Sequence, residues 1–378
     1  MIPCQRELFE IPDDIAYFNC AYTAPLLRSG AAAGRAALQA KSESWTITSK
    51  HFFTAIEENR MLFGKLVACN PNHVAIIPAV SYGIALAAKN LPTQKGQSVL
   101  VLEDQFPSNV YAWKRLADSK GIKVATISRP SDHDWTSAVL EAIDSNTAIA
   151  AMPNCHWTDG TLVDLIQVGE KCREVGAALV VDGTQSLGAM PFSVASVQPD
   201  YLITTAHKWL LGPYSFGFCH IAPRWQTGVP LEENWLNRAG SEDFARLVDY
   251  RDEYQPGARR YDVGEASNFI LAPIAQAALR QLLAWGVDTI AATLKSKTDH
   301  IASKARELGF QVSPDNTRAP HMLGLSIPEG LSENFPNILA QEKVFVSVRG
   351  NSIRVAPHVY NTEADVTRLL SALKKAIL

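Results

Sequence analysis

Short apolar runs alternate with amphipathic stretches over the first half of the chain. The apolar runs are typical of buried strands and predict strands at 74–78, 98–103, 124–127, 148–152, 177–182 and 201–203. The intervening stretches carry apolar side chains at helical spacing and predict helices at 52–66, 81–90, 110–119, 135–143 and 165–175. Apolar strands that alternate with helices indicate a mainly parallel α/β sheet with helices on both faces.

The pattern changes after about residue 257. Helices are predicted at 273–285, 287–308 and 363–377, and short strands at 323–327, 344–348 and 352–355, with Thr362 as N-cap of the last helix. We therefore predict a large domain at 36–256 and a smaller C-terminal α/β domain at 257–378. The N-terminal segment 1–35 is expected to pack with the small domain.

Composition narrows the class of protein. The chain has 378 residues, of which 47% are hydrophobic and 19% charged, and its net charge is −3. This balance gives no electrostatic reason to expect nucleic acid or an anionic membrane as partner. No apolar run reaches the roughly 18 residues of a membrane span, and the first residues do not resemble a signal peptide. The six scattered cysteines fit reduced thiols in a cytoplasm better than a disulfide framework or a metal site.

Candidate functional residues gather where the predicted strands end. In parallel sheets, ligands bind beyond the carboxyl ends of the strands. The residues at or just past those ends are Ser81, Phe106, His156, Asp182 and Lys208. Their convergence predicts one site at this edge of the sheet.

Asp182 and Lys208 suggest the chemistry of that site. Asp182 ends the strand at 177–182, and Lys208 follows the strand at 201–203. An acid at the end of one strand and a lysine after the next strand are typical of a pyridoxal phosphate (PLP) enzyme. The lysine amine forms a Schiff base with the cofactor aldehyde, and the aspartate keeps the pyridine nitrogen protonated so that the ring can act as an electron sink.

The chain resembles the class V aminotransferase group of fold type I PLP-dependent enzymes, which includes cysteine desulfurases, kynureninases and isopenicillin-N-epimerase-like proteins. The most specific part of the resemblance is Val180–Ser186 followed by Thr205–Lys208. The resemblance implies a mainly parallel, seven-stranded type of sheet between helices and a smaller C-terminal domain. It also implies PLP as cofactor, an amino acid as substrate and a homodimer.

Three residues match phosphate contacts of this family. Ser81 begins a predicted helix, where free N–H groups suit a phosphate, although an ordinary helix cap is compatible with the same position. Thr205 and His207 match the other two contacts. Taken alone, His207 would be better explained as a buried histidine bonded to the backbone, but its place next to Lys208 favours the phosphate contact.

Two further residues match contacts to the cofactor ring. Phe106 is expected on the ring face, where cysteine desulfurases place a histidine, and simple core packing is its alternative. Gln185 is expected to hydrogen-bond the phenolic oxygen of PLP. His156 stands where the family has an asparagine. It could orient the cofactor, touch the substrate or act as an auxiliary acid–base group, or it could be an ordinary loop histidine.

The resemblance assigns the substrate carboxylate to Arg354, because a guanidinium binds a carboxylate with two parallel hydrogen bonds. Arg349 is a second candidate, with a solvent-exposed ion pair as its alternative. The segment Gly264–Asn268 matches a loop that reaches the phosphate in the neighbouring subunit. Glu265 replaces the usual threonine there, so Ser267 or the backbone would have to supply the contact.

The reaction type is the part that these motifs leave open. An external aldimine and an α-carbanion are expected, after which transamination, epimerisation or β-elimination and other lyase chemistry use the same core residues. Residues 346–352 contain no cysteine, so the nucleophile of a desulfurase is missing. An aminotransferase is therefore the leading interpretation. A PLP-fold sensor is disfavoured by the retained Lys208, Asp182 and Arg354, and a nucleotide-binding protein by the lack of a glycine-rich phosphate loop.

Overall fold

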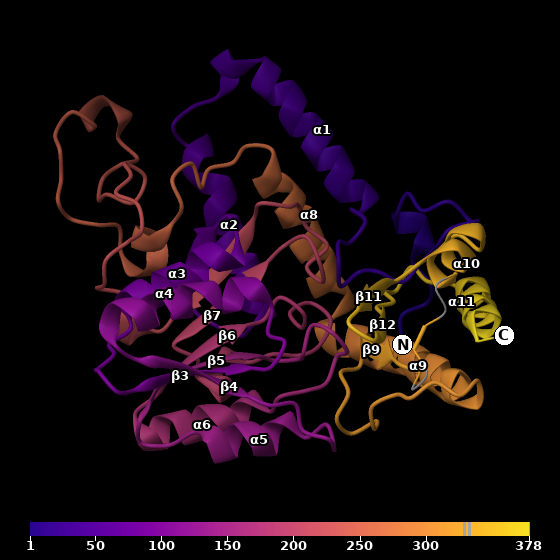
Figure 1. Ribbon diagram of the computed structural model, residues 1–378. Coiled ribbons are helices and arrows are strands. Elements are labelled where there is room, and N and C mark those ends of the chain that lie inside the picture. The colour runs from indigo at the N-terminus through magenta and orange to yellow at the C-terminus, as the bar shows by residue number, and fades with distance from the viewer. Residues whose placement is uncertain (328–329, 332–333, 378) are drawn as a thin grey trace.

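A seven-stranded sheet forms the centre of the computed structural model, which describes residues 1–327, 330–331 and 334–377 (Figure 1). In spatial order the strands are β2 (Val74–Ile77), β8 (Gly217–Ile221), β7 (Tyr201–Thr205), β6 (Ala178–Asp182), β5 (Thr147–Pro153), β3 (Ser98–Leu102) and β4 (Lys123–Ile127). Only β8 runs against its neighbours, so the predicted mainly parallel sheet is confirmed. β8 was not predicted, because Gly217 and His220 interrupt its apolar run although all five of its residues are buried.

Helices cover both faces of this sheet, as predicted. They are α2 (His51–Leu66), α3 (Val80–Asn90), α4 (Tyr111–Lys120), α5 (Trp135–Ala142), α6 (Leu165–Val175) and the short α7 (Val194–Val197). Alternate residues of β3 enter two separate cores: Val99 packs in the core that contains Trp113 of α4, and Leu100 in the one that contains Trp135 of α5. This alternation is the two-residue period of a strand buried on both faces.

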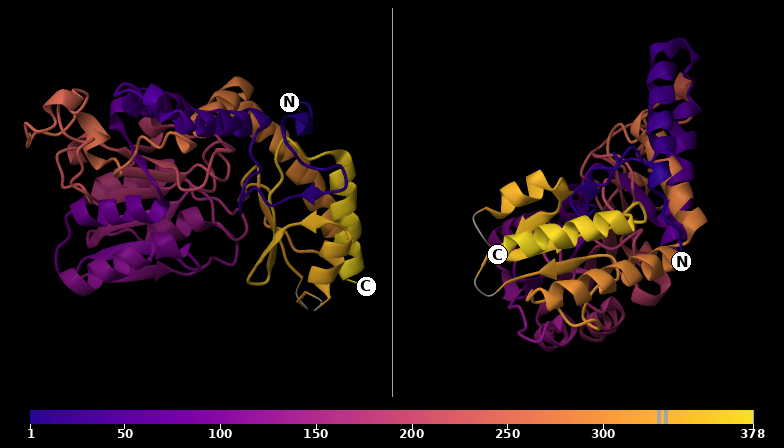
Figure 2. Two further views of the ribbon diagram at one scale, coloured as in Figure 1. Left: turned by 90° about the horizontal axis from the view of Figure 1, so that it is seen from above. Right: turned by 90° about the vertical axis from the view of Figure 1, so that its right-hand side faces the viewer.

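Two long helices pack together beside the sheet. α1 (Arg28–Ser42) lies against α8 (Leu271–Trp285), and Figure 2 shows the pair side by side. A Cβ atom on Gly34 would lie 2.8 Å from the Ile274 side chain, so the close approach depends on glycine. α1 was not predicted, because its small residues carry little apolar periodicity.

The C-terminal part contains a three-stranded antiparallel sheet in the order β11 (Ser347–Arg349), β12 (Ser352–Val355) and β9 (Leu323–Leu325). The helices here are α9 (Val287–Glu307), α10 (Phe335–Gln341) and α11 (Glu363–Ala376). Thr362 caps α11 in a reciprocal arrangement with Asp365, as expected for its N-cap.

The predicted strand 344–348 is divided in two. β10 (Val344–Phe345) pairs in parallel with β1 (Ala16–Tyr17), whereas β11 pairs with β12. Ala16 and Phe18 thus lie in the apolar core of the C-terminal part. The domain boundaries proposed from the sequence, 35/36 and 256/257, stay a prediction.

Short 3-10 turns complete the described structure: η1 (Arg6–Leu8), η2 (Ser44–Thr46), η3 (Pro71–His73), η4 (Pro107–Asn109), η5 (Pro223–Trp225), η6 (Phe244–Arg246) and η7 (Gly257–Tyr261). Within the described ranges, no helix has the length and apolarity to cross a membrane.

Candidate active site

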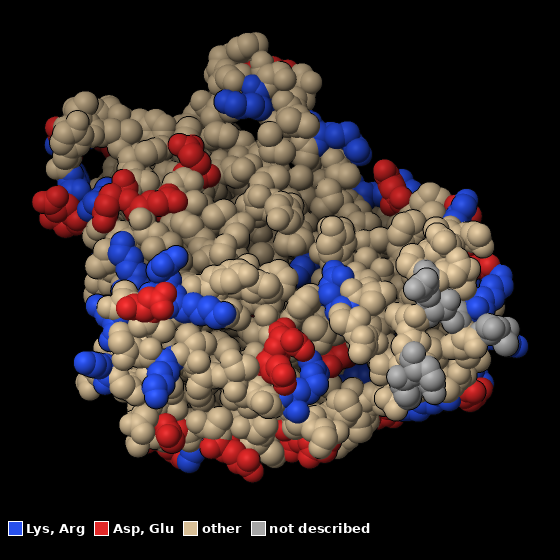
Figure 3. All heavy atoms as spheres, viewed as in Figure 1, with Lys and Arg blue, Asp and Glu red and all other residues tan. Residues whose placement is uncertain are grey.

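A cavity of about 380 Å³ opens at the carboxyl ends of β5, β6 and β7. Its lining includes seven of the predicted site residues: Ser81, Phe106, Asp182, Gln185, Thr205, His207 and Lys208. In the space-filling view, basic side chains lie in and beside a hollow at the centre of the molecule (Figure 3). A larger surface groove of about 720 Å³ lies over α5 and α6, but none of its lining residues was predicted as part of a site.

Lys208 lies in the turn after β7, with its side chain in the cavity. The residue is only 9% exposed, and its Nζ lies 5.3 Å from the centre of the Phe106 ring. Burial lowers the pKa of Lys208 to about 8, because the charged amine loses solvation. Asp182 acts in the opposite direction, and the cations Arg354 and Arg349 lower the pKa further. At pH 7 about a tenth of this amine is therefore neutral and nucleophilic, far more than of a lysine with the ordinary pKa of about 10.4.

Asp182 is the last residue of β6 and faces the same cavity. Its Oδ1 accepts a hydrogen bond from the Thr184 N–H at 3.0 Å. Burial raises the pKa of the Asp182 carboxyl. Among the described residues, none forms an ion pair with it within 4.0 Å. A buried carboxylate without an ion-pair partner is suited to bind a cation, such as a protonated pyridine nitrogen.

The Gln185 side chain is hydrogen-bonded on both of its polar atoms. Trp209 Nε1 donates to Oε1 at 2.9 Å, and Nε2 donates to the Ala21 carbonyl at 3.1 Å. Neither Trp209 nor Ala21 was predicted as part of the site, although Trp209 directly follows Lys208. The amide of Gln185 therefore has a defined direction at the cavity wall.

Unpartnered polar atoms lie at the end of the cavity where the phosphate was expected. Thr205 Oγ1 and His207 Nδ1 are buried and have no hydrogen-bond partner. Burial, together with the nearby Lys208, lowers the pKa of His207 to about 4. Ser81 lies in the first turn of α3, whose N-cap is Ala79, so its hydroxyl is not the helix cap. Buried groups without partners are costly, and an anion at the start of α3 would satisfy them.

His156 does not line the cavity. Its Nε2 lies 3.0 Å from the Glu103 carbonyl, and its Nδ1 lies 2.7 Å from Thr158 Oγ1 and 3.2 Å from an Arg129 nitrogen. The ring stacks on Trp135, and burial lowers the pKa of His156. These contacts match the ordinary loop histidine that the sequence left open. Asp159 binds Arg129 at 2.5 Å and completes this polar network, which had no clear sequence signal.

Trp157 lines the cavity and contacts both arginines that were expected to bind substrate. Its indole donates to the Asp104 carbonyl and meets Phe106 edge to face. Arg354 and Arg349 place their guanidinium groups 6.0 Å and 5.6 Å from the Trp157 ring centre. Both arginines thus stand beside the cavity, although neither is part of its immediate wall.

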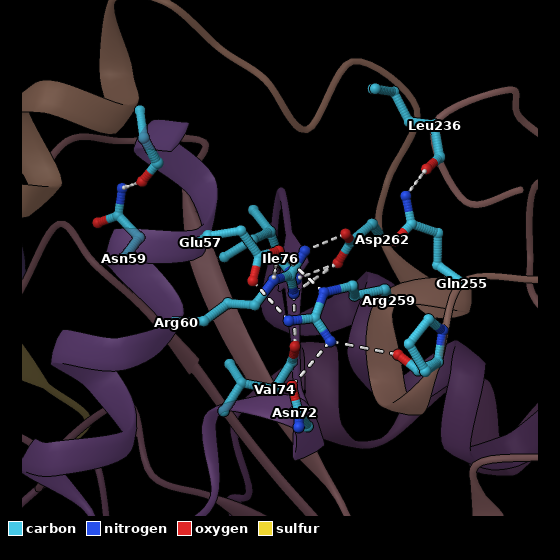
Figure 4. Close-up of polar contacts among 12 residues, drawn as sticks. Glu57, Asn59, Arg60, Asn72, Val74, Ile76, Leu236, Gln255, Arg259 and Asp262 are labelled. Atoms are coloured by element: carbon cyan, nitrogen blue, oxygen red, sulfur yellow. Dashed lines mark hydrogen bonds and ion pairs between the residues drawn. The ribbon is translucent and has the colours of Figure 1, made fainter. Parts of the chain in front are cut away.

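The segment Gly264–Asn268 follows a charge cluster in which Arg60 and Asp262 are buried, shown in Figure 4. Asp262 forms an ion pair with Arg60 of α2 and accepts a hydrogen bond from the Ile76 N–H at 2.8 Å. Glu57 binds Arg60 at 3.0 Å and Arg259 at 2.9 Å. The cluster joins α2, β2 and the start of the segment, and was not predicted because its members lie far apart in sequence.

Within the segment, the polar groups are bonded inside the same chain. The Ser267 hydroxyl donates to the Phe52 carbonyl at 2.6 Å, and the Gly264 N–H donates to Glu232 at 2.6 Å. Glu265 has a positive φ of 61°. Any contact of this segment with a neighbouring subunit's phosphate stays a prediction.

Residues 36–369 match the family model for class V aminotransferases. The chain belongs to the class V aminotransferase family. Membership confirms the predicted family and makes the chain a PLP-dependent enzyme. The unpartnered Thr205 and His207, the buried Asp182 and the low-pKa amine of Lys208 fit this cofactor.

Relatives in the family carry different activities in their names. An uncharacterized aminotransferase, YcbU, from Bacillus subtilis strain 168 is 27% identical over 355 residues, covering 89% of both chains. An isopenicillin N epimerase from Streptomyces clavuligerus is 24% identical over 329 residues, covering 83% of this chain and 82% of its own. The family alone therefore does not select one reaction.

Solved structures confirm fold type I. A C-DES mutant with glycine covalently linked to the PLP cofactor superposes with a TM-score of 0.86 at 18% identity, covering 98% of this chain and 99% of its own. An apo cysteine desulfurase from Thermococcus onnurineus NA1 has a TM-score of 0.82 at 17% identity, covering 100% of this chain and 99% of its own.

Proposed function

We propose that this PLP-dependent enzyme is an aminotransferase that acts on an amino acid, with Lys208 as its proton-transferring base. The observation that carries the role of Lys208 is the pairing of this residue, whose pKa is lowered to about 8, with the buried Asp182 across one cavity. The chemistry that bound PLP supplies is an aldehyde that bonds amines and a ring that stabilises negative charge on the substrate α-carbon. Asp182 would hold a proton on the ring nitrogen.

The remaining residues position the cofactor and the substrate. Ser81, Thr205 and His207 would hold the phosphate, and Phe106 would lie against the ring face. Gln185 would donate a hydrogen bond to the phenolic oxygen. Arg354, with Arg349 nearby, would bind the substrate carboxylate on the side of Trp157. His156 would act indirectly, because its hydrogen bonds hold the 156–159 turn that presents Trp157.

The identity of the proton donors favours transamination over epimerisation. A single base can remove the α-proton and return it to the cofactor carbon on the same face, whereas epimerisation by direct transfer needs a proton donor on the opposite face. Cys155, which also lines the cavity, is fully buried, and burial raises the pKa of its thiol. A thiol in this environment stays protonated and is a poor base, so epimerisation in both directions would lack a second base beside Lys208.

Lyase and epimerase reactions are the second candidates. The similarity to relatives named isopenicillin N epimerase supports the epimerase alternative. The decisive experiment is a panel of amino acids with and without a keto acid acceptor, in which keto acid, racemised amino acid, and sulfide or alanine are measured. Acceptor-dependent keto acid formation supports the proposal. Racemisation without an acceptor, or release of a β-substituent, would replace it with the corresponding alternative.

A homodimer in the cytoplasm is also part of the proposal. Trp45, after α1, is 82% exposed, and Tyr250, in the loop before η7, is 97% exposed. Both segments project from the same side of the molecule (Figure 1). Tyr250 stands with the exposed Phe244, Leu247 and Val248 in one loop, and such a group of exposed apolar side chains is typical of an interface. The six cysteines are all free thiols, in keeping with a reducing compartment.

A further inference from the structure

The direction of the Gln185 amide is fixed by two groups of opposite polarity. The indole N–H of Trp209 can only donate a hydrogen bond, and the Ala21 carbonyl can only accept one. Trp209 therefore requires Oε1 on its side, at 2.9 Å, and Ala21 requires Nε2, at 3.1 Å. Exchanging the two ends of the amide would break both hydrogen bonds inside a buried site.

Trp209 is itself held rigidly. Its side chain is fully buried and meets His321 edge to face at a centroid distance of 4.4 Å. His321 Nε2 lies 2.6 Å from the Gln185 main-chain carbonyl, and burial lowers the pKa of His321 to about 4. The neutral ring donates from Nε2, so the same pair of residues holds both the side chain and the backbone of Gln185.

We propose that Trp209 is a positioning residue, which turns the Gln185 amide so that its second N–H faces the cavity as a hydrogen-bond donor to PLP. The inference rests on the proposed function, which assigns Gln185 to the phenolic oxygen. Without Trp209, only the Ala21 carbonyl would restrain the amide, and its second N–H could tilt away from the phenolic oxygen. With Trp209, the contact is restricted to donation. Trp209 thereby acts on the cofactor through Gln185, without touching it.

The consequence is measurable in the absorbance of the Lys208-bound cofactor. A hydrogen-bond donor to the phenolic oxygen stabilises negative charge on that oxygen. This stabilisation is stronger when the nitrogen bonded to Lys208 is deprotonated than when it is protonated. It therefore lowers the pH at which the visible band titrates. Trp209→Phe removes the indole N–H and keeps an aromatic ring. We expect the midpoint to rise by about 0.3–1 pH unit, which corresponds to one hydrogen bond of ordinary net strength.

Gln185→Leu sets the scale, because it removes the donor altogether. Its midpoint should rise by more than that of Trp209→Phe. The double variant should titrate like Gln185→Leu alone, because Trp209 has nothing left to orient. Trp113→Phe is the matched control: this tryptophan is also fully buried, donates to Asn109 Oδ1 at 3.1 Å and lies outside the cavity lining. It should lower the thermal stability and leave the midpoint unchanged.

The possible results separate the inference from the proposed function. If Gln185→Leu shifts the midpoint and Trp209→Phe does not, or if the two shifts add in the double variant, Trp209 is not a positioning residue. No shift in Gln185→Leu would instead overturn the proposed contact of Gln185. If Trp209→Phe fails to fold, the indole ¹⁵N–¹H resonances of the wild type and of Gln185→Leu are compared instead. Loss of the hydrogen bond should move the Trp209 signal in Gln185→Leu. If no tryptophan signal moves, the bond between Trp209 and Gln185 is contradicted.

Discussion

Arg354 donates a hydrogen bond from Nη1 to the main-chain carbonyl of Trp157 at 2.7 Å. The side chain is 1% exposed, and its Nε is buried without a partner. Because Nη1 is already bonded, the edge formed by Nε and Nη2 is the one left to bind a carboxylate through two parallel hydrogen bonds. Trp157 therefore holds the guanidinium in a fixed orientation while leaving this edge for an anion.

Replacing Arg354 by alanine should mainly raise KM for amino acid substrates, because the contact binds ground state and transition state alike. Loss of such a buried charged contact is expected to cost about 2–5 kcal/mol. The absorbance of bound PLP should be nearly unchanged. Steady-state kinetics of Arg354→Ala beside Arg349→Ala test the assignment. A larger effect at Arg349, which is more exposed, would show that it is the principal carboxylate ligand.

The lowered pKa of Lys208 predicts how the apoprotein takes up PLP. Only the neutral amine attacks the aldehyde, and with a pKa near 8 half of it is neutral at about pH 8. The uptake rate should rise with pH and level off above about 8, whereas a free lysine side chain would keep gaining reactivity up to its ordinary pKa of about 10.4. Stopped-flow absorbance against pH, with N-acetyl-lysine as reference, measures the difference.

The site of attachment can be tested in the same preparation. Borohydride reduction followed by peptide mapping should place the pyridoxyl group on Lys208. Lys208→Ala should lose the visible band and keep the far-ultraviolet circular dichroism of the wild type. A pyridoxyl group on another lysine of the wild-type protein would contradict the assignment.

Asp182→Asn should reduce catalysis far more than PLP occupancy. A neutral amide cannot hold a proton on the ring nitrogen, so negative charge at the substrate α-carbon is poorly stabilised. The substitution retains the size of the side chain and an oxygen for the Thr184 N–H, which lies 3.0 Å from Oδ1. Turnover and PLP content should be measured on one sample. Near-normal turnover would mean that Asp182 has another role.

The sequence predicted six of the seven strands of the main sheet and the edge at which the site lies, because both follow from local patterns. Apolar runs define β3 to β7, and residues at strand ends are adjacent in a parallel sheet. The orientation of His156 was not predictable in the same way. Its neighbours Glu103, Arg129 and Trp135 come from other loops and elements, and only the folded chain shows that they turn the ring away from the cavity.

Trp209 shows a different limit of sequence reasoning. Its place beside Lys208 was visible, but the apolar run that follows it is equally compatible with simple core packing. The bond to Gln185 depends on the register of two loops that follow neighbouring strands, β6 and β7. The division of residues 344–348 between β10 and β11 is a similar case, since both halves have strand-forming side chains and only their partners differ.

The proposed homodimer predicts a concentration-independent mass of about twice 41.3 kDa in light scattering. Tyr250→Asp and Trp45→Asp place a charge on each projecting segment and should shift the protein toward monomer, since a buried unpaired charge is costly. Tyr111→Asp is a matched control, because Tyr111 is 67% exposed on α4, a helix that packs on the sheet and belongs to neither projecting segment (Figure 1). A wild-type protein that is active and monomeric at assay concentration would exclude the dimer.

The Arg60–Asp262 pair predicts a stability effect that is separate from catalysis. Asp262→Leu leaves the fully buried Arg60 without its principal partner, and removal of one member of a buried ion pair typically costs about 3–5 kcal/mol. The double variant Arg60→Met, Asp262→Leu should recover part of this loss, because no unpaired charge remains. Arg280→Met, which breaks an exposed ion pair with Glu58, is the control and should change the free energy of unfolding by less than about 1 kcal/mol. Urea unfolding of the wild-type apoprotein and of these three variants measures the differences. If Asp262→Leu is no more destabilising than Arg280→Met, the cluster does not anchor the segment that follows it.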